Sequence, residues 1–222
     1  MGMIVNGAVY RDGRRMRDIA IEDIGEALKE DGAFIWLGLH EPDEPLMKKV
    51  QHAFGLHDLA VEDAHRAHQR PKLEAYGDSL FVALHTAQMI EDKIHFGETH
   101  VFVGPQYVVT VRHGASLTYA PLRGRCEANP DHLRKGPGYV LYALMDFVVD
   151  NYFPIIEGLE DQLSDLEDRI FKGAYKRRTT GELYTLKREL MTLRRAVMPL
   201  TEICNYLARF EGPLIPESTR PY

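Results

Sequence analysis

The densest cluster of side chains able to do chemistry lies at residues 57–68, with the sequence HDLAVEDAHRAH. On a helix, Asp58, Glu62 and His65 share one face, and Asp63 lies about 100° around from Glu62. Adjacent carboxylates suit hard cations such as Mg²⁺, which prefers oxygen ligands and keeps several waters. The pattern alone favours a simpler explanation, a solvated acidic helix face. A Zn²⁺ or Co²⁺ site on the histidines is the weaker alternative.

A second candidate pair is Asp146 and Asp150, one helical turn apart in an otherwise apolar segment. Two carboxylates at this spacing repel each other in isolation. A divalent cation or a basic partner would relieve the repulsion. One paired aspartate beside one exposed aspartate explains the pattern equally well, so the spacing leaves both interpretations open.

Motifs of common enzymes are absent from the sequence, including GxSxG, GxxxxGK, GxGxxG and HExxH. His40 and Glu41 follow an apolar segment and could support acid–base chemistry, but polar residues are common where a strand meets a loop. We therefore expect a protein that is not an enzyme. A hydrolase built on the cluster at residues 57–68 is the alternative, and no motif supports it.

The elements that would position these residues change in character near residue 138. Before it, apolar segments predict strands at 3–10, 18–22, 33–39, 79–89, 94–103 and 106–112, the first two as a hairpin around a charged turn. Helices are expected from Asp43 to a C-cap at Gly55 and from Asp58 to Arg66. The alternation predicts an α/β domain over residues 1–137, a mixed β-sheet layered between helices (α/β/α).

From residue 138 the apolar spacing is helical. Segments 156–170 and 183–207 carry apolar residues at alternating spacings of three and four, which is typical of coiled-coil seams. We therefore expect a long antiparallel helical hairpin within residues 138–222, packed on the sheet domain. Pro199 lies inside the second seam and should kink that helix, since it removes a backbone donor.

Charge is strongly polarised along this hairpin. Residues 140–171 contain eight acidic residues and one basic residue, whereas residues 172–210 contain nine basic and three acidic residues. The simpler interpretation is that the two helices pair with each other, which would set their orientation more than their stability. The alternative is an acidic face that attracts hydrated cations or a basic partner.

Length and composition set further limits. The chain has 222 residues, 45% of them hydrophobic, and a net charge of −6, which suits a globular protein and argues against nucleic-acid binding. Cys126 and Cys204 are far apart, so we expect two buried free thiols and no disulfide. The longest charge-free apolar segment, 101–111, is shorter than the about 20 residues of a membrane helix. We therefore expect no membrane span in this chain.

Several motifs resemble the cytoplasmic domain of CorA-type magnesium and cobalt transporters. They are FGLHDLAVED at 54–63, HQRPKLE at 68–74, YGDSLFV at 76–82, YVLYALMD at 139–146, DNYF at 150–153, and LRR with MPLTE at 193–202. The segment VEDAHRAHQRPKLE at 61–74 is the most specific of them. The resemblance runs from about residue 33 to residue 222.

This resemblance implies the cation-sensing domain of a homopentameric Mg²⁺/Co²⁺ channel, on the cytoplasmic side of the cell membrane. Mg²⁺ bound between subunits would hold the channel closed. The family's acidic pair at this sensor matches Glu62 and Asp63, and a further acidic ligand matches Asp146. Asp150 remains a metal candidate by its spacing alone. The implied ligand is Mg²⁺, with Co²⁺ and other divalent cations as alternatives.

The family's stalk helix, membrane helices and Gly-Met-Asn pore sequence do not occur in these 222 residues. The sensor's opposing carboxylate belongs to that stalk. The resemblance therefore implies a soluble fragment that ends before the stalk, holds about half of each sensor site, and self-associates weakly or not at all. A related zinc-transporting branch shares the architecture, although QRPK at 69–72 favours the magnesium branch. A structural interaction module that uses the charged hairpin is the alternative from another class.

Overall fold

The computed structural model describes residues 3–66, 69–91, 93–115, 117–173, 177–210, 212 and 214–215. A seven-stranded sheet runs through it in the order β2-β1-β3-β7-β6-β5-β4. The strands are β1 (Ile4–Arg11), β2 (Arg14–Asp18), β3 (Ala33–His40), β4 (Lys72–Tyr76), β5 (Ser79–Ile90), β6 (Lys93–Gly104) and β7 (Tyr107–Gly114). Only β3 and β7 pair in parallel, so the described sheet is mixed, as predicted.

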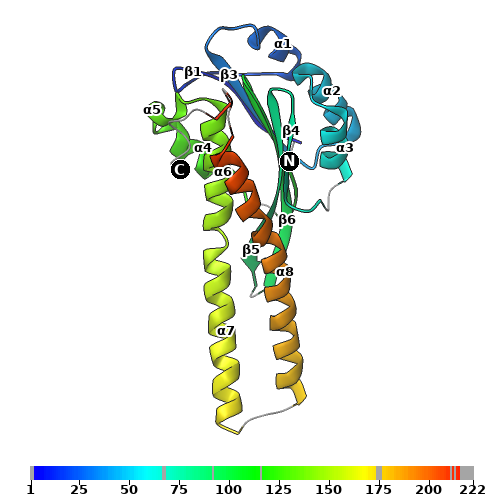
Figure 1. The fold of residues 1–222 in the computed structure, drawn as a ribbon, viewed down its shortest axis with the longest axis vertical. Coiled ribbons are helices and arrows are strands. Elements are labelled where there is room, and N and C mark those ends of the chain that lie inside the picture. Colours follow the sequence, from blue (N-terminus) through cyan, green and yellow to red (C-terminus); the bar gives the residue numbers. More distant parts are fainter. Residues whose placement is uncertain are drawn as a thin grey trace.

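Helices cover both faces of the sheet (Figure 1). The 3₁₀ turn η1 (Ile21–Asp23) and helices α1 (Ile24–Ala27), α2 (Glu44–Phe54) and α3 (Asp58–Arg66) lie on one face, and α4 (Ala120–Glu127), α5 (Pro130–Leu133) and α6 (Pro137–Asp150) lie on the other. Two hydrophobic clusters fill the layers. Along β3, Phe34 and Trp36 point into one cluster, while Ile35 and Leu37 point into the other. This explains why β3 is apolar throughout, and it confirms the α/β/α class.

The helix that precedes the candidate acidic cluster has a clear N-cap and a clear C-cap. Asp43 caps α2, accepting a hydrogen bond from the Leu46 amide at 2.9 Å, and proline stands in the first turn. Gly55 ends the helix with a left-handed φ of 65°. After residues 55–57, α3 begins at Asp58, and Gln51 of α2 donates a 2.6 Å hydrogen bond to the Asp58 carboxylate. These contacts fix the position of α3 relative to α2.

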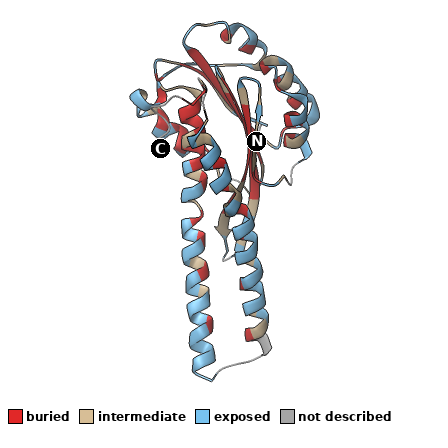
Figure 2. Cartoon of the chain, in the orientation of Figure 1, coloured by how far each residue is buried: buried red, intermediate tan, exposed pale blue. Residues whose placement is uncertain are grey.

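The C-terminal part of the chain forms the predicted antiparallel hairpin, α7 (Phe153–Phe171) and α8 (Arg177–Ala208), which projects from one end of the sheet (Figure 1). A seam that includes Leu159, Leu166, Leu186 and Leu193 is buried, while the outer sides of both helices are exposed (Figure 2). The seam belongs to the same hydrophobic cluster as α6 and one face of the sheet. Pro199 lies inside α8, as predicted.

The predicted strand at 18–22 is wrong, because β2 starts earlier, at Arg14, and η1 follows it. Asp12 and Gly13 make the tight turn with φ values of 51° and 74°. A Cβ on Gly13 would lie 1.9 Å from the carbonyl oxygen of Pro130, so this close approach requires glycine. Every residue of β2 is exposed, and it therefore carries no apolar pattern from which a strand could be predicted.

Two further elements have no clear signal in the sequence. The edge strand β4 has no fully buried residue. Helix α4 buries Arg123 beside Leu122 and Cys126, so its buried face is not uniformly apolar. The Arg123 guanidinium donates to Tyr10 Oη at 2.7 Å and stacks 4.0 Å from the Trp36 ring. A buried arginine satisfied in this way obscures the helical period on which such predictions rest.

Candidate metal site

Helix α3 carries the first candidate pair on its outer side. Ala60, Val61 and Ala64 are buried against the sheet, which leaves Glu62 exposed and Asp63 half-buried at the edge near β4. Alternation of small apolar and acidic residues thus fixes the orientation of the helix. Both carboxylates are presented where a ligand or another subunit could reach them.

Glu62 pairs with a basic residue of its own helix. Its Oε1 lies 2.7 Å from Nη2 of Arg66, one turn later, and both side chains are largely exposed. Exposed pairs of this kind contribute little to stability and exchange readily with solvent ions. Glu62 is therefore accessible to a cation at small cost.

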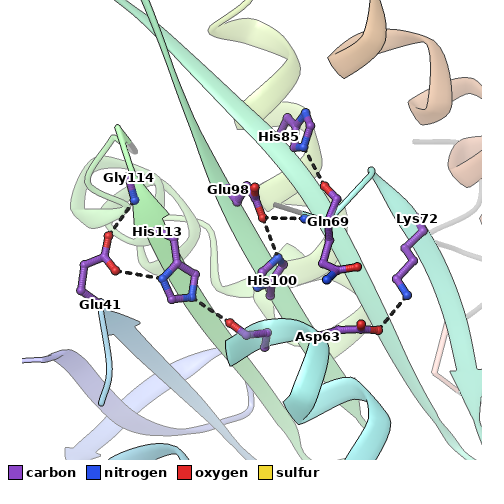
Figure 3. Close-up of polar contacts among 10 residues, drawn as sticks. Glu41, Asp63, Gln69, Lys72, His85, Glu98, His100, His113 and Gly114 are labelled. Carbon is purple, nitrogen blue, oxygen red and sulfur yellow. Dashed lines mark hydrogen bonds and ion pairs between the residues drawn. The ribbon is translucent and has the colours of Figure 1, made fainter. Parts of the chain in front are cut away.

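Asp63 is more tightly held. The Nζ atom of Lys72, on β4, lies 2.7 Å from Asp63 Oδ2 and 3.0 Å from Glu74 Oε1, so one ammonium bridges two carboxylates. Figure 3 shows Lys72 reaching from the strand to α3. Partial burial acts to lower the pKa of Lys72, but the hydrogen bonds and charges of the two carboxylates outweigh it and raise that pKa.

Tyr76 completes this group. Its hydroxyl donates a 2.7 Å hydrogen bond to Glu74 Oε2, the carboxylate oxygen that Lys72 does not contact. Burial and the neighbouring carboxylate raise the pKa of Tyr76 to about 12, so the phenol stays protonated and remains a donor at neutral pH. Both carboxylate oxygens of Glu74 are consequently held, one by Lys72 and the other by Tyr76.

The second candidate pair lies on the other face of the sheet. Asp146 and Asp150 are exposed on α6, whose apolar residues pack against the sheet. Desolvation, followed by the charge of Asp150, raises the pKa of Asp146, and the charge of Arg125 opposes this rise. Repulsion between the two aspartates is therefore present and only partly relieved.

Asp146 also lines a small cavity of about 310 Å³ between α6 and α8, together with Met145, Val149 and Cys204. Cys204 is exposed, which corrects the expectation that both thiols are buried. Partial burial of the thiol still raises its pKa. Cys126 is buried, and both thiols are free, as predicted.

The sheet separates the two candidate pairs, because α3 and α6 pack into different hydrophobic clusters. Within the described residues, no three His, Cys, Asp or Glu side chains are grouped so that they could hold a metal ion. The structure therefore brings together Glu62 with Asp63 and Asp146 with Asp150, but not the four residues. A complete metal site would need ligands beyond those that this chain groups together.

A polar network beneath α3 was not predicted (Figure 3). His85 Nε2 donates to the Gln69 carbonyl at 2.7 Å, and the Gln69 amide donates to Glu98 Oε2 at 3.2 Å. His100 is fully buried with Nε2 3.2 Å from Glu98 Oε2, yet neither ring nitrogen makes a well-oriented hydrogen bond within the described part of the chain. The network fastens the segment after α3 to β5 and β6.

The same network reaches α3 itself through His113. Its Nε2 lies 2.9 Å from the carbonyl oxygen of Ala64, the residue after Asp63. The sequence signal was the alternation of Glu98 and His100 on one strand, which places both side chains on the same face. The sequence alone makes His40 and Glu41 candidates for acid–base chemistry. Instead, Glu41 binds the Gly114 amide and His113.

Charges on the hairpin do not pair across it as the simpler interpretation predicted. Among the described residues, the ion pair that joins α7 to α8 is Arg169 with Glu182, the minority charge of each helix. The acidic residues of α7 between 157 and 168 are exposed, and so are Lys187, Arg188, Arg194 and Arg195 of α8. The two charged surfaces therefore face solvent.

Comparison with known proteins now decides the family. The family described as "CorA-like Mg2+ transporter protein" matches residues 31–222. The chain belongs to this CorA-like family. It is 30% identical over 201 residues to the putative metal ion transporter YfjQ of Bacillus subtilis, covering 90% of this chain and 61% of that protein. It is 31% identical over 188 residues to the cobalt/magnesium transport protein CorA of Thermotoga maritima, covering 83% and 53%.

Solved structures agree on the fold. The full-length CmaX protein gives a TM-score of 0.79 at 23% identity, covering 99% of this chain and 67% of that one. The soluble domain of CorA from Methanocaldococcus jannaschii gives 0.74 at 18% identity, covering 100% and 86%. The ZntB cytoplasmic domain from Vibrio parahaemolyticus gives 0.71 at 12% identity, covering 100% and 84%. At these identities the likeness shows the fold.

The CorA-like chain spans between half and two thirds of the length of the first two curated relatives. Within its described residues, one helical segment, Pro137–Phe171, is long and apolar enough to cross a membrane by length and composition. The longest charge-free apolar segment of the sequence, 101–111, lies outside it. Half of the most apolar 18 residues of Pro137–Phe171 are buried inside the protein, where α6 packs on the sheet. This packing accounts for the apolar composition.

Proposed function

We propose that this chain is the cytoplasmic, divalent-cation-sensing region of a CorA-type Mg²⁺/Co²⁺ transporter, and that it is not an enzyme. The observation that carries the proposal is the pair Glu62 and Asp63 on the outer side of α3, within the motif that resembles the family's sensor. The family match over residues 31–222 and relatives named as cobalt or magnesium transporters support it. The ligand is Mg²⁺, with Co²⁺ as the alternative.

The mechanism follows from electrostatics. Carboxylates that face each other across a subunit interface repel when the site is empty, and a divalent cation between them cancels that repulsion. A ligand that binds the closed interface more tightly than the open one shifts the population toward closure. Binding through retained waters gives modest affinity and fast exchange, which suits a sensor of the cation that the transporter carries.

Separation of the two candidate pairs by the sheet fits a ring of subunits. In a closed ring of identical chains, two different surfaces of the chain meet at every interface. The α3 face of one subunit, with Asp63, then meets a different face of the next subunit, and the α6 face with Asp146 and Asp150 is one such surface. A homopentamer in the intact protein would complete sites that a single chain holds only in part.

The proposal is tested in the intact transporter. Replacing Glu62 and Asp63 with alanine should weaken the protection from proteolysis that Mg²⁺ gives to the cytoplasmic ring. Replacing Glu26 and Asp131, two exposed acids outside the candidate pairs, should leave protection as it is. Protection that survives the loss of Glu62 and Asp63 would rule out their role as sensor ligands.

A second function is favoured by the outward charges of the hairpin. Since α7 and α8 present acidic and basic surfaces to solvent, the hairpin is suited to dock a charged partner. Capture of a basic protein that depends on salt and not on metal would support this structural role. Loss of that capture on replacing Asp161 and Asp165 with asparagine would assign it to α7.

A further inference from the structure

One ammonium group lies where a cation would be expected at the α3 site. Lys72 Nζ is within 3.0 Å of both Asp63 Oδ2 and Glu74 Oε1, and the side chains of Lys72 and Asp63 are only 30% and 24% exposed. The two carboxylates come from different elements, α3 and β4, and no other side chain joins them in the contacts that the structure describes. Lys72 thus holds together two acids that would otherwise repel.

We propose that Lys72 is a built-in competitor for the divalent cation at Asp63, and that Glu74 is a further carboxylate of the same site. This inference rests on the proposed sensor function of Asp63. A cation that approaches Asp63 must displace the ammonium or share the carboxylate with it. The affinity of the site, and hence the cation concentration to which it responds, is set partly by the strength of the lysine contact.

The positive charge of Lys72 should weaken cation binding at Asp63. An ammonium 2.7 Å from the carboxylate repels an incoming divalent cation, and at a partly buried position solvent screens this repulsion only in part. Lysine suits a replaceable counter-ion, because its ammonium is a point charge on a flexible stem, without the fixed two-pronged grip of a guanidinium. Once released, the side chain can turn to solvent.

Glu74 is prepared to act as the second carboxylate. The Tyr76 hydroxyl holds its Oε2, and this leaves Oε1 on the side of Lys72, the residue that also contacts Asp63. Two carboxylates that share one ammonium are spaced closely enough to share one hydrated cation, which binds through water at longer range than a direct ligand. The Glu62–Arg66 pair is exposed and has no such second acid among the described residues, so it offers no comparable competition.

The test measures, in the intact transporter and its variants at low ionic strength, the Mg²⁺ concentration that gives half-maximal protection of the cytoplasmic ring from proteolysis, with Co²⁺ as a second probe. K72Q should tighten binding about three- to tenfold, because it removes the competing charge while keeping a polar side chain. K72R retains the charge and should bind more weakly than K72Q. The matched control is K48Q, which removes a lysine from an exposed pair with Glu44 and should leave affinity unchanged.

Two further variants separate this inference from the proposed function. D63N should weaken binding in both the wild-type and K72Q backgrounds, and E74Q should remove the gain that K72Q gives. Unchanged affinity in K72Q, together with weaker binding in D63N, would overturn the competitor role while the sensor role of Asp63 stands. A D63N chain that binds as well as wild type would contradict the proposed function itself. A gain in K72Q that persists in E74Q would remove Glu74 from the site.

A measurement without substitution keeps the inference testable if K72Q fails to fold. The side-chain ¹⁵Nζ and ¹³Cε resonances of Lys72 should shift during a Mg²⁺ titration of the wild-type chain, with the same midpoint as binding. The resonances of Lys48 serve as the internal reference. Lys72 resonances that stay constant while Mg²⁺ binds would show that the ammonium does not yield to the cation.

Discussion

Nδ1 of His113 lies 2.9 Å from Oε2 of Glu41, and this contact clamps the ends of two parallel strands. Glu41 directly follows β3, and its other oxygen accepts a 2.7 Å hydrogen bond from the Gly114 amide at the end of β7. The second nitrogen of His113 faces the carbonyl of Ala64 in α3. Both ring nitrogens therefore face acceptors, and both hydrogen bonds form together only when each nitrogen carries a proton or Glu41 is protonated.

Removing the Glu41 carboxylate should loosen this clamp. In E41A the Gly114 amide and the His113 ring each lose an acceptor, and we expect a loss of about 1–2 kcal/mol in the free energy of unfolding. Urea denaturation of the chain measures it. E26A is the matched control, since Glu26 pairs with Lys29 at the surface and should contribute almost nothing. Equal stability of E41A and E26A would contradict the clamp.

Acid should weaken the protein through Glu41 and Glu98. Burial acts to raise the pKa of each carboxyl, but for Glu41 the Gly114 amide and His113 lower it below 4.5, and for Glu98 His100 and the Gln69 amide do the same. A carboxyl whose pKa is lowered in the folded state stabilises the protein above its unfolded pKa, and this contribution is lost as the pH falls through the folded value. The melting temperature should therefore drop steadily from about pH 4.5 downward.

The variant E41Q tests the assignment of this acid sensitivity. It removes one titrating group, so the fall in melting temperature between pH 5 and pH 3 should be shallower than in the wild type. The control is E91Q, because Glu91 has no ion pair among the described residues. Its melting temperature should fall with pH as steeply as that of the wild type. A parallel slope in E41Q would place the acid-sensitive group elsewhere.

Much of the fold could be predicted from the sequence because its elements have strong local signals. The caps at Asp43 and Gly55, the continuous apolar segment of β3 and the alternating seams of the hairpin each depend on residues close in the chain. Strands β2 and β4 escaped prediction because neither has a fully buried residue, and α4 escaped it because its buried face depends on distant partners. Arg123, for example, is buried only because Tyr10 and Trp36 surround it, and no local pattern contains that information.

The residues of the candidate site could be predicted from the sequence, but their arrangement in space could not. Spacing and resemblance pointed to Glu62, Asp63 and Asp146, but only the fold shows that a sheet lies between the first two and the third. The contact between Lys72 and Asp63 could not be predicted, because the two residues are nine positions apart and lie on different elements. The assignment of the four acids as metal ligands remains a prediction.

The ionised carboxylate of Asp146 should slightly destabilise the folded state. Desolvation, with the charge of Asp150 next, raises its pKa above 3.8, so the folded state is destabilised as the pH rises through the interval between that value and the raised one. Without divalent cations, D146N should therefore be slightly more stable than the wild type at pH 7. The gain should stay below about 0.5 kcal/mol, because solvent screens exposed charges.

Added Mg²⁺ shows whether Asp146 is a metal ligand or only an aspartate that its neighbour repels. If Asp146 contributes to a cation site, Mg²⁺ should raise the melting temperature of the wild type more than that of D146N. D131N, which changes an exposed aspartate of α5, should respond as the wild type does. Identical Mg²⁺ responses of the wild type and D146N would remove Asp146 from the candidate ligands.

The hairpin seam should contribute to the stability of the whole chain, because it shares one hydrophobic cluster with α6 and the sheet. Leu193 is 3% exposed, so L193A leaves a cavity and should cost about 2–4 kcal/mol. Leu190, on the same helix, is 54% exposed, and L190A should change stability by less than about 0.5 kcal/mol. Chemical denaturation, followed by the fluorescence of Trp36 in the sheet, reports whether the seam and the sheet unfold together. A hairpin that melts in L193A without moving the Trp36 transition would show that the two parts are energetically separate.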